Sequence, residues 1–245
     1  MASIAVIPAR GGSKSVPRKN LVNLLGHPLI AYSIDAALKC KRIDRVIVST
    51  DDEGIADYAF KYGAEVVRRP AEFATDDARD GGLILHILQV HPDIRADDKL
   101  IFLRPTHPIR NPDTITAAQK HFERNSSEFS SLRSMKSSQE IVFKTWGIAK
   151  DGSAMPAFNP RLTQVEDPSN APRQILPQTF YQDGYVEVLT FSTVIEFGNT
   201  AGPKVLPFLI DEFSHDIDYL SDLEQISKYL TGSQLPDWFS FPVQR

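Results

Sequence analysis

The chain has 245 residues but only one cysteine, Cys40, and no apolar run close to the ~20 residues that a membrane helix needs. A single cysteine excludes an intrachain disulfide and a zinc site built from several thiolates. We expect Cys40 in the core, at the end of a helix. The first residues also lack the charged and then apolar pattern of a signal peptide. We therefore expect a cytoplasmic protein with no membrane partner.

The sequence also has no large excess of charge of either sign. The 27 basic and 31 acidic residues give a net charge of −4, which argues against general nucleic-acid binding. The sequence contains neither HExxH nor GxSxG, so two common hydrolase chemistries have no support. Its length and its apolar fraction of 42% suit an ordinary globular protein. We expect one domain over residues 1–245.

Strand-like and helix-like segments alternate through the first half of the chain. The expected strands are 3–8, 45–49, 64–67 and 99–103, and the expected helices are 28–40, 53–62, 80–91 and 112–124. This order predicts an α/β, Rossmann-like fold with a mostly parallel sheet and helices on both faces.

The alternation stops between about 139 and 178, where five prolines exclude a regular helix or a central strand. This stretch is interpreted as an inserted arm. Regular structure is expected again as a strand over 184–190, a short helix from 192, a strand over 204–210 and a closing helix over 219–230.

The first strand runs directly into a glycine loop with the sequence PARGGSKSVPRKN, residues 8–20. Gly11 and Gly12 allow the backbone to turn and to approach a ligand closely, so that successive N–H groups face phosphate oxygens. The cations of the loop are Arg10, Lys14, Arg18 and Lys19. Neither GxxxxGK[ST] nor GxGxxG occurs in it. The loop predicts a polyphosphate site, and the alternative is a basic surface turn.

Polar residues also follow the next three expected strands, at 49–52, 68–70 and 104–106. In an open α/β sheet, ligands bind outside the carboxyl ends of the strands, so these segments are expected to meet around one ligand. Asp51 or Asp52 alone is equally well explained as the N-cap of the following helix.

Asp216 and Asp218 are the candidate metal ligands. Residues two apart in an extended segment project to the same side, so both carboxylates can face one Mg²⁺ while Ile217 packs inward. The alternative is a solvated acidic turn. Asp222 is expected in the first turn of a helix, where the macrodipole favours it. His215 either assists at the metal or is a structural hydrogen-bond donor.

The glycine loop resembles the PARGGSKGxPxKN signature of the acylneuraminate cytidylyltransferase (CMP-sialic acid synthetase) family, with Ser15 where glycine is common. Residues 103–110, LRPTHPIR, resemble its (Q/R)PTSPLR element, with His107 in place of serine. Residues 69–78, RPAEFATDDA, are similar to RPxELAxD. Residues 173–185 resemble RQxxPxxYxxNGxxY, with Asp183 in place of asparagine. The resemblance extends from about residue 4 to 230.

The resemblance implies a sugar-activating nucleotidyltransferase. A hydroxyl on the anomeric carbon of a nonulosonic, sialic-acid-like sugar acid would attack the α-phosphate of CTP and give a CMP-sugar and pyrophosphate, with Mg²⁺ as cofactor. The expected partners are CTP, a small sugar acid and, through the arm, a second copy in a homodimer. Another sugar such as a Kdo-like acid, another nucleotide, or a non-catalytic nucleotide-sugar-binding protein stays open.

The resemblance also assigns residues. The catalytic set is Lys19 at the α-phosphate, Arg10 at the leaving phosphates, and Asp216 with Asp218 at the metal. Nucleotide contacts are expected from Ala9, Arg10, Gly11, Gly12, Ser13, Lys14, Arg18, Lys19, Asn20, Arg69 and Ala78. Acceptor contacts are expected from Arg104, Thr106, Arg173, Gln178, Asp183 and Tyr185. Arg173 either pairs with the acceptor carboxylate or forms a structural ion pair, and Asp183 either binds the sugar or caps the turn at Gly184.

Overall fold

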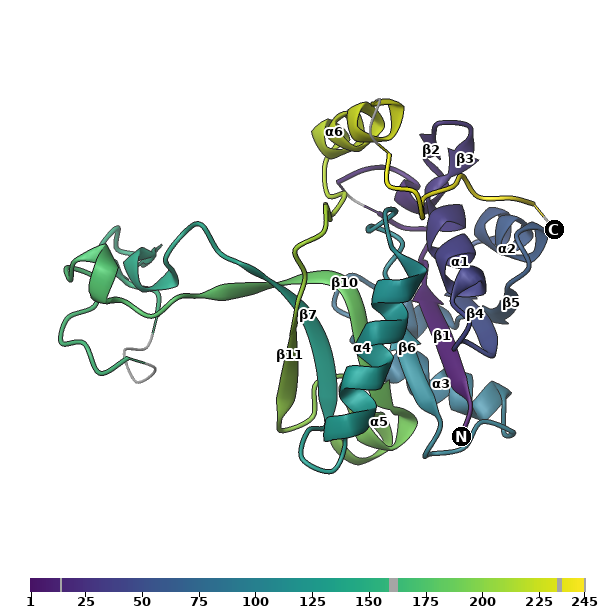
Figure 1. The fold of residues 1–245 in the computed structure, drawn as a ribbon, viewed down its shortest axis with the longest axis horizontal. Coiled ribbons are helices and arrows are strands. Elements are labelled where there is room, and N and C mark those ends of the chain that lie inside the picture. Colours follow the sequence, from purple (N-terminus) through teal and green to yellow (C-terminus); the bar gives the residue numbers. More distant parts are fainter. Residues whose placement is uncertain (14, 159–162, 233–234, 245) are drawn as a thin grey trace. The chain divides into compact units, whose positions relative to one another are not determined.

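The computed structural model describes residues 1–13, 15–158, 163–232 and 235–244. Its main feature is a seven-stranded sheet in the order β11-β7-β10-β6-β1-β4-β5 (Figure 1). The strands are β1 (Ser3–Pro8), β4 (Arg45–Thr50), β5 (Glu65–Arg68), β6 (Lys99–Phe102), β7 (Ser131–Ser137), β10 (Phe180–Thr190) and β11 (Val205–Leu209). β1 runs parallel to both β4 and β6, β4 runs parallel to β5, and β10 is antiparallel to β6. The predicted, mostly parallel sheet is confirmed.

The helices lie close to the predicted ranges. They are α1 (Leu29–Lys39), α2 (Glu53–Lys61), α3 (Asp80–Val90), α4 (Pro112–Asn125), α5 (Phe191–Phe197) and α6 (Leu220–Thr231). β7 was not predicted, and β10 begins four residues before the expected start at 184. Two short antiparallel pairs were also missed, β2 (Asn23–Leu24) with β3 (His27–Pro28) and β8 (Trp146–Ile148) with β9 (Ala154–Pro156).

The core forms on both faces of the parallel strands. Ile4 and Val6 of β1 belong to a buried cluster with side chains of α3 and α5, whereas α1 contacts β1, β4 and α4. Because side chains alternate along a strand, the residues between them, Ala5 and Ile7, face the opposite side and are fully buried there. Figure 1 shows α1 and α4 in front of the sheet. The helices thus cover the faces of the sheet, and polar loops follow the carboxyl ends of β1, β5 and β6.

Cys40 is buried, as predicted, and its Sγ lies 3.3 Å from the hydroxyl of Thr116. Within the described part of the chain, no helix combines the length and the apolar character that a membrane crossing requires.

Gly81 allows α3 to approach the end of α5. A Cβ at this position would lie 2.2 Å from the carbonyl oxygen of Gly198. We expect Gly81→Ala to lower the free energy of unfolding by about 1–3 kcal/mol, because the overpacking outweighs the better helix propensity of alanine. Thermal unfolding measures this. Gly12→Ala is the matched control, since a Cβ there meets no atom within 4 Å. An equally stable Gly81→Ala chain would show that the two helices can move apart at little cost.

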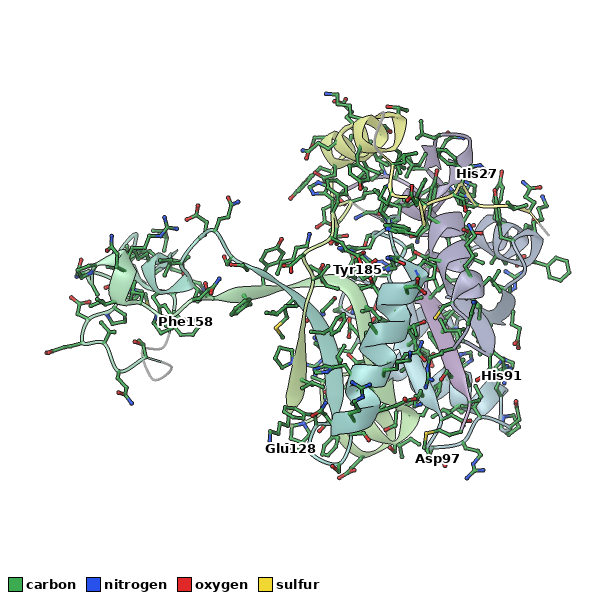
Figure 2. The ribbon with its side chains drawn as sticks, viewed as in Figure 1. His27, His91, Asp97, Glu128, Phe158 and Tyr185 are labelled. Carbon is green, nitrogen blue, oxygen red and sulfur yellow. The ribbon has the colours of Figure 1, made fainter. Side chains whose placement is uncertain are left out.

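By internal contacts the chain divides into two compact units. The first comprises Met1–Ser134, Asp183–Phe208 and Glu212–Arg245, and the second comprises Met135–Gln182 and Leu209–Asp211. The second unit contains the β8–β9 pair and its own apolar cluster, in which Phe158 packs edge-on against Phe143 with ring centroids 4.9 Å apart (Phe158 is labelled in Figure 2). The irregular segment expected at about 139–178 lies in this unit, and its role as an arm stays a prediction.

Candidate active site

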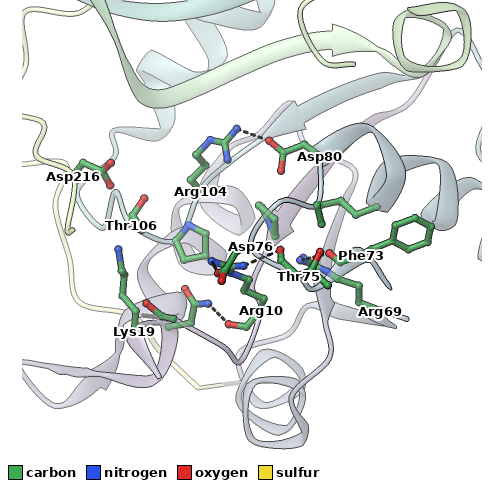
Figure 3. Close-up of a pocket in the computed structure, with 16 residues that line it drawn as sticks. Arg10, Lys19, Arg69, Phe73, Thr75, Asp76, Asp80, Arg104, Thr106 and Asp216 are labelled. Carbon is green, nitrogen blue, oxygen red and sulfur yellow. Dashed lines mark hydrogen bonds and ion pairs between the residues drawn. The ribbon is translucent and has the colours of Figure 1, made fainter. Parts of the chain in front are cut away.

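A cavity of about 350 Å³ lies in the first unit at the carboxyl ends of β1, β5 and β6 (Figure 3). It is lined by Pro8, Arg10, Ser13, Lys19, Asn20, Arg69, Phe73, Thr75, Asp76, Ala78, Asp80, Leu83, Arg104, Pro105, Thr106 and Asp216. Three of the expected polar strand ends therefore meet around one space. This is the position at which open α/β sheets bind ligands.

The glycine loop is fixed from both sides. The amide of Asn20 donates to the carbonyl oxygen of Arg10 at 2.9 Å, and the backbone N–H of Gly11 donates to Oδ1 of Asp51 at 2.9 Å. A Cβ at Gly11 would lie 2.9 Å from Cβ of Asp52, so only glycine fits at this approach. The backbone at Arg10 and Gly11 is thus held in place without a ligand.

Asp52 resolves one of the open alternatives. Its Oδ1 accepts from the backbone N–H of Ile55 at 2.9 Å, so Asp52 is the N-cap of α2. The same carboxylate pairs with Arg18 at 3.0 and 3.1 Å. Arg18 has φ +50, in the left-handed region, and its side chain is mostly exposed. Arg18 therefore anchors the loop to α2 and does not line the cavity.

Lys19 joins the glycine loop to the aspartate segment. Its Nζ donates to the carbonyl oxygen of Ile217 at 2.7 Å and to Oδ1 of Asp218 at 3.0 Å. The side chain of Ile217 is fully buried, as predicted. Two segments almost 200 positions apart in the sequence thus meet at one buried ammonium group.

Asp216 faces the cavity beside Thr106 (Figure 3). Burial raises the pKa of Asp216, and the negative charge of Asp218 raises it further, against a hydrogen bond from Thr106 that lowers it. Nδ1 of the buried His107 lies 3.4 Å from Oδ1 of Asp216. The ammonium group of Lys19, which pairs with Asp218, acts in the opposite direction and lowers the pKa of Asp216.

The donor set suits Mg²⁺. This ion is commonly held by one or two carboxylates together with substrate phosphates. Asp216 lines the cavity and supplies one hard oxygen donor there, whereas Asp218 is not part of the lining and pairs with Lys19 at 3.0 Å. No cluster of three His, Cys, Asp or Glu side chains that could hold a metal occurs among the described residues. The other ligands of a Mg²⁺ ion bound here would be water molecules or phosphate oxygens.

Asp222 and His215 serve the start of α6. Oδ2 of Asp222 accepts from the backbone N–H of Tyr219 at 2.7 Å and of Asp218 at 2.8 Å. This is the helix-start role predicted for Asp222. Nε2 of His215 lies 3.5 Å from Oδ1 of Asp222, which places the imidazole at the cap.

Two arginines, Arg69 directly after β5 and Arg10 of the glycine loop, contact neighbouring residues on one side of the cavity. Arg69 is buried and donates to the hydroxyl and carbonyl oxygens of Ser49 at 3.1 and 2.7 Å. Burial lowers the pKa of Arg69. Arg10 donates to the carbonyl oxygen of Thr75 at 2.8 Å and pairs with Asp76 at 2.8 Å. Two cations thus border this side of the cavity.

A third arginine, Arg104, lies between two acids. Its Nη2 is 2.7 Å from Oδ2 of Asp80 and 3.1 Å from Oε1 of Glu187, and its guanidinium lies over the ring of Phe102 at 4.9 Å (the Arg104–Asp80 pair is drawn in Figure 3). Burial alone would lower the pKa of Arg104, but the two carboxylates raise it. Arg104 is therefore a fixed cation in the wall of the cavity.

The cytidylyltransferase family model matches residues 4–150, which include the glycine loop and the ends of β5 and β6. The chain belongs to the cytidylyltransferase family.

Two curated relatives show where the similarity is concentrated. An N-acylneuraminate cytidylyltransferase of Escherichia coli is 40% identical over 141 residues, which cover 56% of this chain and 33% of that protein. A pseudaminic acid cytidylyltransferase of Campylobacter jejuni is 40% identical over 131 residues, which cover 53% of this chain and 56% of the relative. The matched part thus spans about a third to a half of these relatives.

A solved structure of CMP-2-keto-3-deoxy-manno-octonic acid synthetase complexed with CTP has the same fold. The TM-score is 0.66 at 16% sequence identity, and the match covers 94% of this chain and 98% of the other. At this identity the likeness establishes the fold of the chain only.

The cavity brings together many of the residues predicted from sequence. Those that line it are Arg10, Ser13, Lys19, Asn20, Arg69, Ala78, Arg104, Thr106 and Asp216. Gly12 lines a smaller neighbouring hollow with Arg10 and Ser13. Ala9 is fully buried, and its N–H donates to the carbonyl oxygen of Ser49. Lys14 lies outside the described residues.

Two of the residues that were predicted to contact the acceptor sugar, Tyr185 and Asp183, are buried. Tyr185 is fully buried, and its hydroxyl donates to Oε2 of Glu212 at 3.0 Å (Figure 2). Asp183 accepts from the backbone N–H of Tyr185 at 3.1 Å and from the hydroxyl of Ser214 at 3.1 Å. Asp183 thus stabilises the turn at Gly184, one of the two roles considered for it. Contact of either residue with an acceptor stays a prediction.

Arg173 and Gln178 belong to the second unit. The guanidinium of Arg173 donates to the carbonyl oxygen of Gln139, and the amide of Gln178 donates to the hydroxyl of Ser137 at 2.7 Å. Their roles at the acceptor stay predictions.

Sequence reasoning missed four polar or aromatic residues of the lining, namely Phe73, Thr75, Asp76 and Asp80. The first three fall within the 69–78 segment that was singled out, so the segment carried the signal although the residues were not chosen. Asp80 is the first residue of α3, where an acid is usual for the helix dipole. Its pair with Arg104 has no trace in the sequence.

Proposed function

We propose that the chain transfers CMP from CTP to a nonulosonic, sialic-acid-like sugar acid and releases pyrophosphate. The observation that carries this proposal is the cavity itself, where Arg10, Lys19 and Arg69 face the same space as Asp216. A chain of the cytidylyltransferase family with this arrangement has the cations that a triphosphate needs and the carboxylates that a divalent metal needs.

In the proposed reaction the anomeric hydroxyl oxygen of the acceptor forms a bond to the α-phosphorus of CTP. The bond from that phosphorus to the bridging oxygen of the β-phosphate breaks, and pyrophosphate leaves with its electron pair. Lys19 stabilises the charge on the α-phosphate, because its ammonium group is held at the cavity by Asp218. Arg10 and the N–H groups of the glycine loop hold the departing phosphates.

The aspartates have a second proposed role. Asp216 and Asp218 would hold Mg²⁺, which would supply positive charge to the triphosphate when bound. Asp216 reaches the cavity and orients the acceptor hydroxyl, whose proton is released in the reaction. Arg69 and Ala78 line the cavity, and the proposal assigns the nucleoside to Arg69 and to the backbone near Ala78.

The names of the relatives support an acceptor of this class. They are cytidylyltransferases for N-acylneuraminate and pseudaminic acid. The eight-carbon acid of the structurally similar synthetase is the second candidate, because its fold matches over 94% of the chain. A cytoplasmic location and a homodimer complete the proposal.

A pyrophosphate-release assay tests the proposal. CTP, UTP, ATP and GTP are each combined with sialic, legionaminic, pseudaminic and eight-carbon ulosonic acids in the presence of Mg²⁺. We expect release with CTP and one nine-carbon acid, a CMP-sugar by mass spectrometry, and no release after EDTA. Release with another nucleotide alone would overturn the cytidine assignment. Nucleotide-sugar binding without any release would favour the non-catalytic alternative.

A further inference from the structure

Glu187 of β10 is a buried carboxylate that the proposed reaction does not use. Its side chain is 1% exposed and does not line the cavity. Oε1 accepts from Nε of Arg104 at 3.3 Å and from its Nη2 at 3.1 Å, and Oε2 lies 3.4 Å from Nη2 of Arg133. A carboxylate removed from water to this extent is costly unless it is well paired, so its position has a structural or functional reason.

Arg104 connects Glu187 to the cavity. Asp80 at the start of α3 and Glu187 on β10 hold the guanidinium from two different elements through Nε and Nη2. Among the residues that the structure describes, Nη1 of Arg104 makes no hydrogen bond. The side chain of Arg104 is one-third exposed and lines the cavity. Nη1 therefore offers two N–H donors in a fixed direction.

Two acids already pair with Arg104. Asp80 and Glu187 each lie within ion-pair distance of its guanidinium, and Arg133 lies beside the second oxygen of Glu187. A further carboxylate or phosphate at Arg104 would meet these two acids, so it would gain less than at an unpaired arginine. An uncharged oxygen, in contrast, can accept a charge-assisted hydrogen bond from Nη1 without this repulsion.

We propose that Glu187 is a positioning residue which, through Arg104, makes this wall of the cavity specific for an uncharged oxygen of the acceptor sugar, either a hydroxyl or an acylamino carbonyl. This inference rests on the proposed function. It places the acid group of the acceptor elsewhere in the site. Asp80 holds the other side of the same guanidinium.

Steady-state kinetics of Glu187→Gln, Arg104→Gln and the double variant test this role. We expect each single variant to raise the KM of the acceptor about tenfold, the scale of one charged hydrogen bond, with the KM of CTP within about twofold. If Glu187 acts through Arg104, the double variant is no worse than Arg104→Gln. Arg133→Gln is the matched control, because it removes the other ion pair of Glu187 and leaves Arg104 paired; its acceptor KM should not change.

Three outcomes would overturn the inference: an unchanged acceptor KM in Glu187→Gln, a raised KM for CTP in its place, or additive effects in the double variant. Calorimetric titration of the sugar acid onto the chain with a non-hydrolysable CTP analogue separates the two proposals. Binding that weakens in Glu187→Gln without any turnover in the unmodified chain would refute the proposed reaction and keep the inference. Turnover at an unchanged rate and with an unchanged acceptor KM in Glu187→Gln would support the proposed reaction and refute the inference. An absence of sugar-acid binding would refute the inference as well.

Discussion

Lys19→Ala is expected to lower kcat by about 100-fold or more, the scale seen when one charge-stabilising donor is removed from an active site. The ammonium group of Lys19 is buried at the cavity and is held at 2.7 Å from the carbonyl oxygen of Ile217 and 3.0 Å from Asp218. Its charge is therefore in place before the phosphate develops negative charge, and no reorganisation is needed during the reaction. Stopped-flow or steady-state pyrophosphate release measures the loss.

A second variant separates charge from anchoring, because Lys19 also joins the glycine loop to the aspartate segment. Lys19→Met keeps the length and the apolar stem but removes the charge, whereas Lys19→Arg keeps a cation. If charge is decisive, Lys19→Met should be as slow as Lys19→Ala and Lys19→Arg should keep part of the activity. If Lys19→Met turns over at the rate of the unmodified chain, Lys19 has no role at the α-phosphate.

The periodicity of the sequence was sufficient for most of the fold. Strands 3–8 and 45–49 contain the short apolar runs 4–7 and 46–48, and helices such as 112–124 have a clear amphipathic pattern. β7 was missed because its sequence, SLRSMKS, alternates small polar and charged residues with two apolar ones and has no β-branched residue. Its place in the sheet is decided by pairing with distant strands, a tertiary effect that a local pattern does not contain.

The site was predictable where its chemistry is concentrated in short segments. The glycine loop and the 216–218 segment were both singled out, and Arg10, Ser13, Lys19 and Asp216 from these segments line one cavity. Their roles at phosphate and metal stay predictions. Contacts between segments were not predictable. The pairing of Lys19 with Asp218 and of Arg104 with Glu187 joins residues 199 and 83 positions apart, and only the folded sheet brings them together.

Arg110 shows the same limit: it ends the 103–110 segment that was singled out, but nothing in that segment indicates which distant groups it contacts. It is almost completely buried, and burial lowers its pKa to about 10, so the guanidinium still carries its charge at neutral pH. Its N–H groups donate to backbone carbonyl oxygens in two segments, the loop after β6 and the beginning of the buried part of β10. The acceptors are the carbonyl oxygens of Arg104, His107, Gly184 and Tyr185 and the hydroxyl of Ser33.

Arg110→Ala is expected to lower the free energy of unfolding by about 3–5 kcal/mol, because it leaves several buried acceptors without a donor and opens a cavity. For a chain of this size the corresponding fall in Tm is about 10 °C. Arg110→Lys should recover only part of the loss, since one ammonium group cannot reach acceptors on both segments. Arg95→Ala is the control, because this arginine is exposed and pairs only with its neighbour Asp97 among the described residues. A Tm for Arg110→Ala equal to that of Arg95→Ala would mean that water replaces the guanidinium at little cost. A large fall would instead show that the loop carrying Arg104 and Thr106 is held in place by this one buried cation.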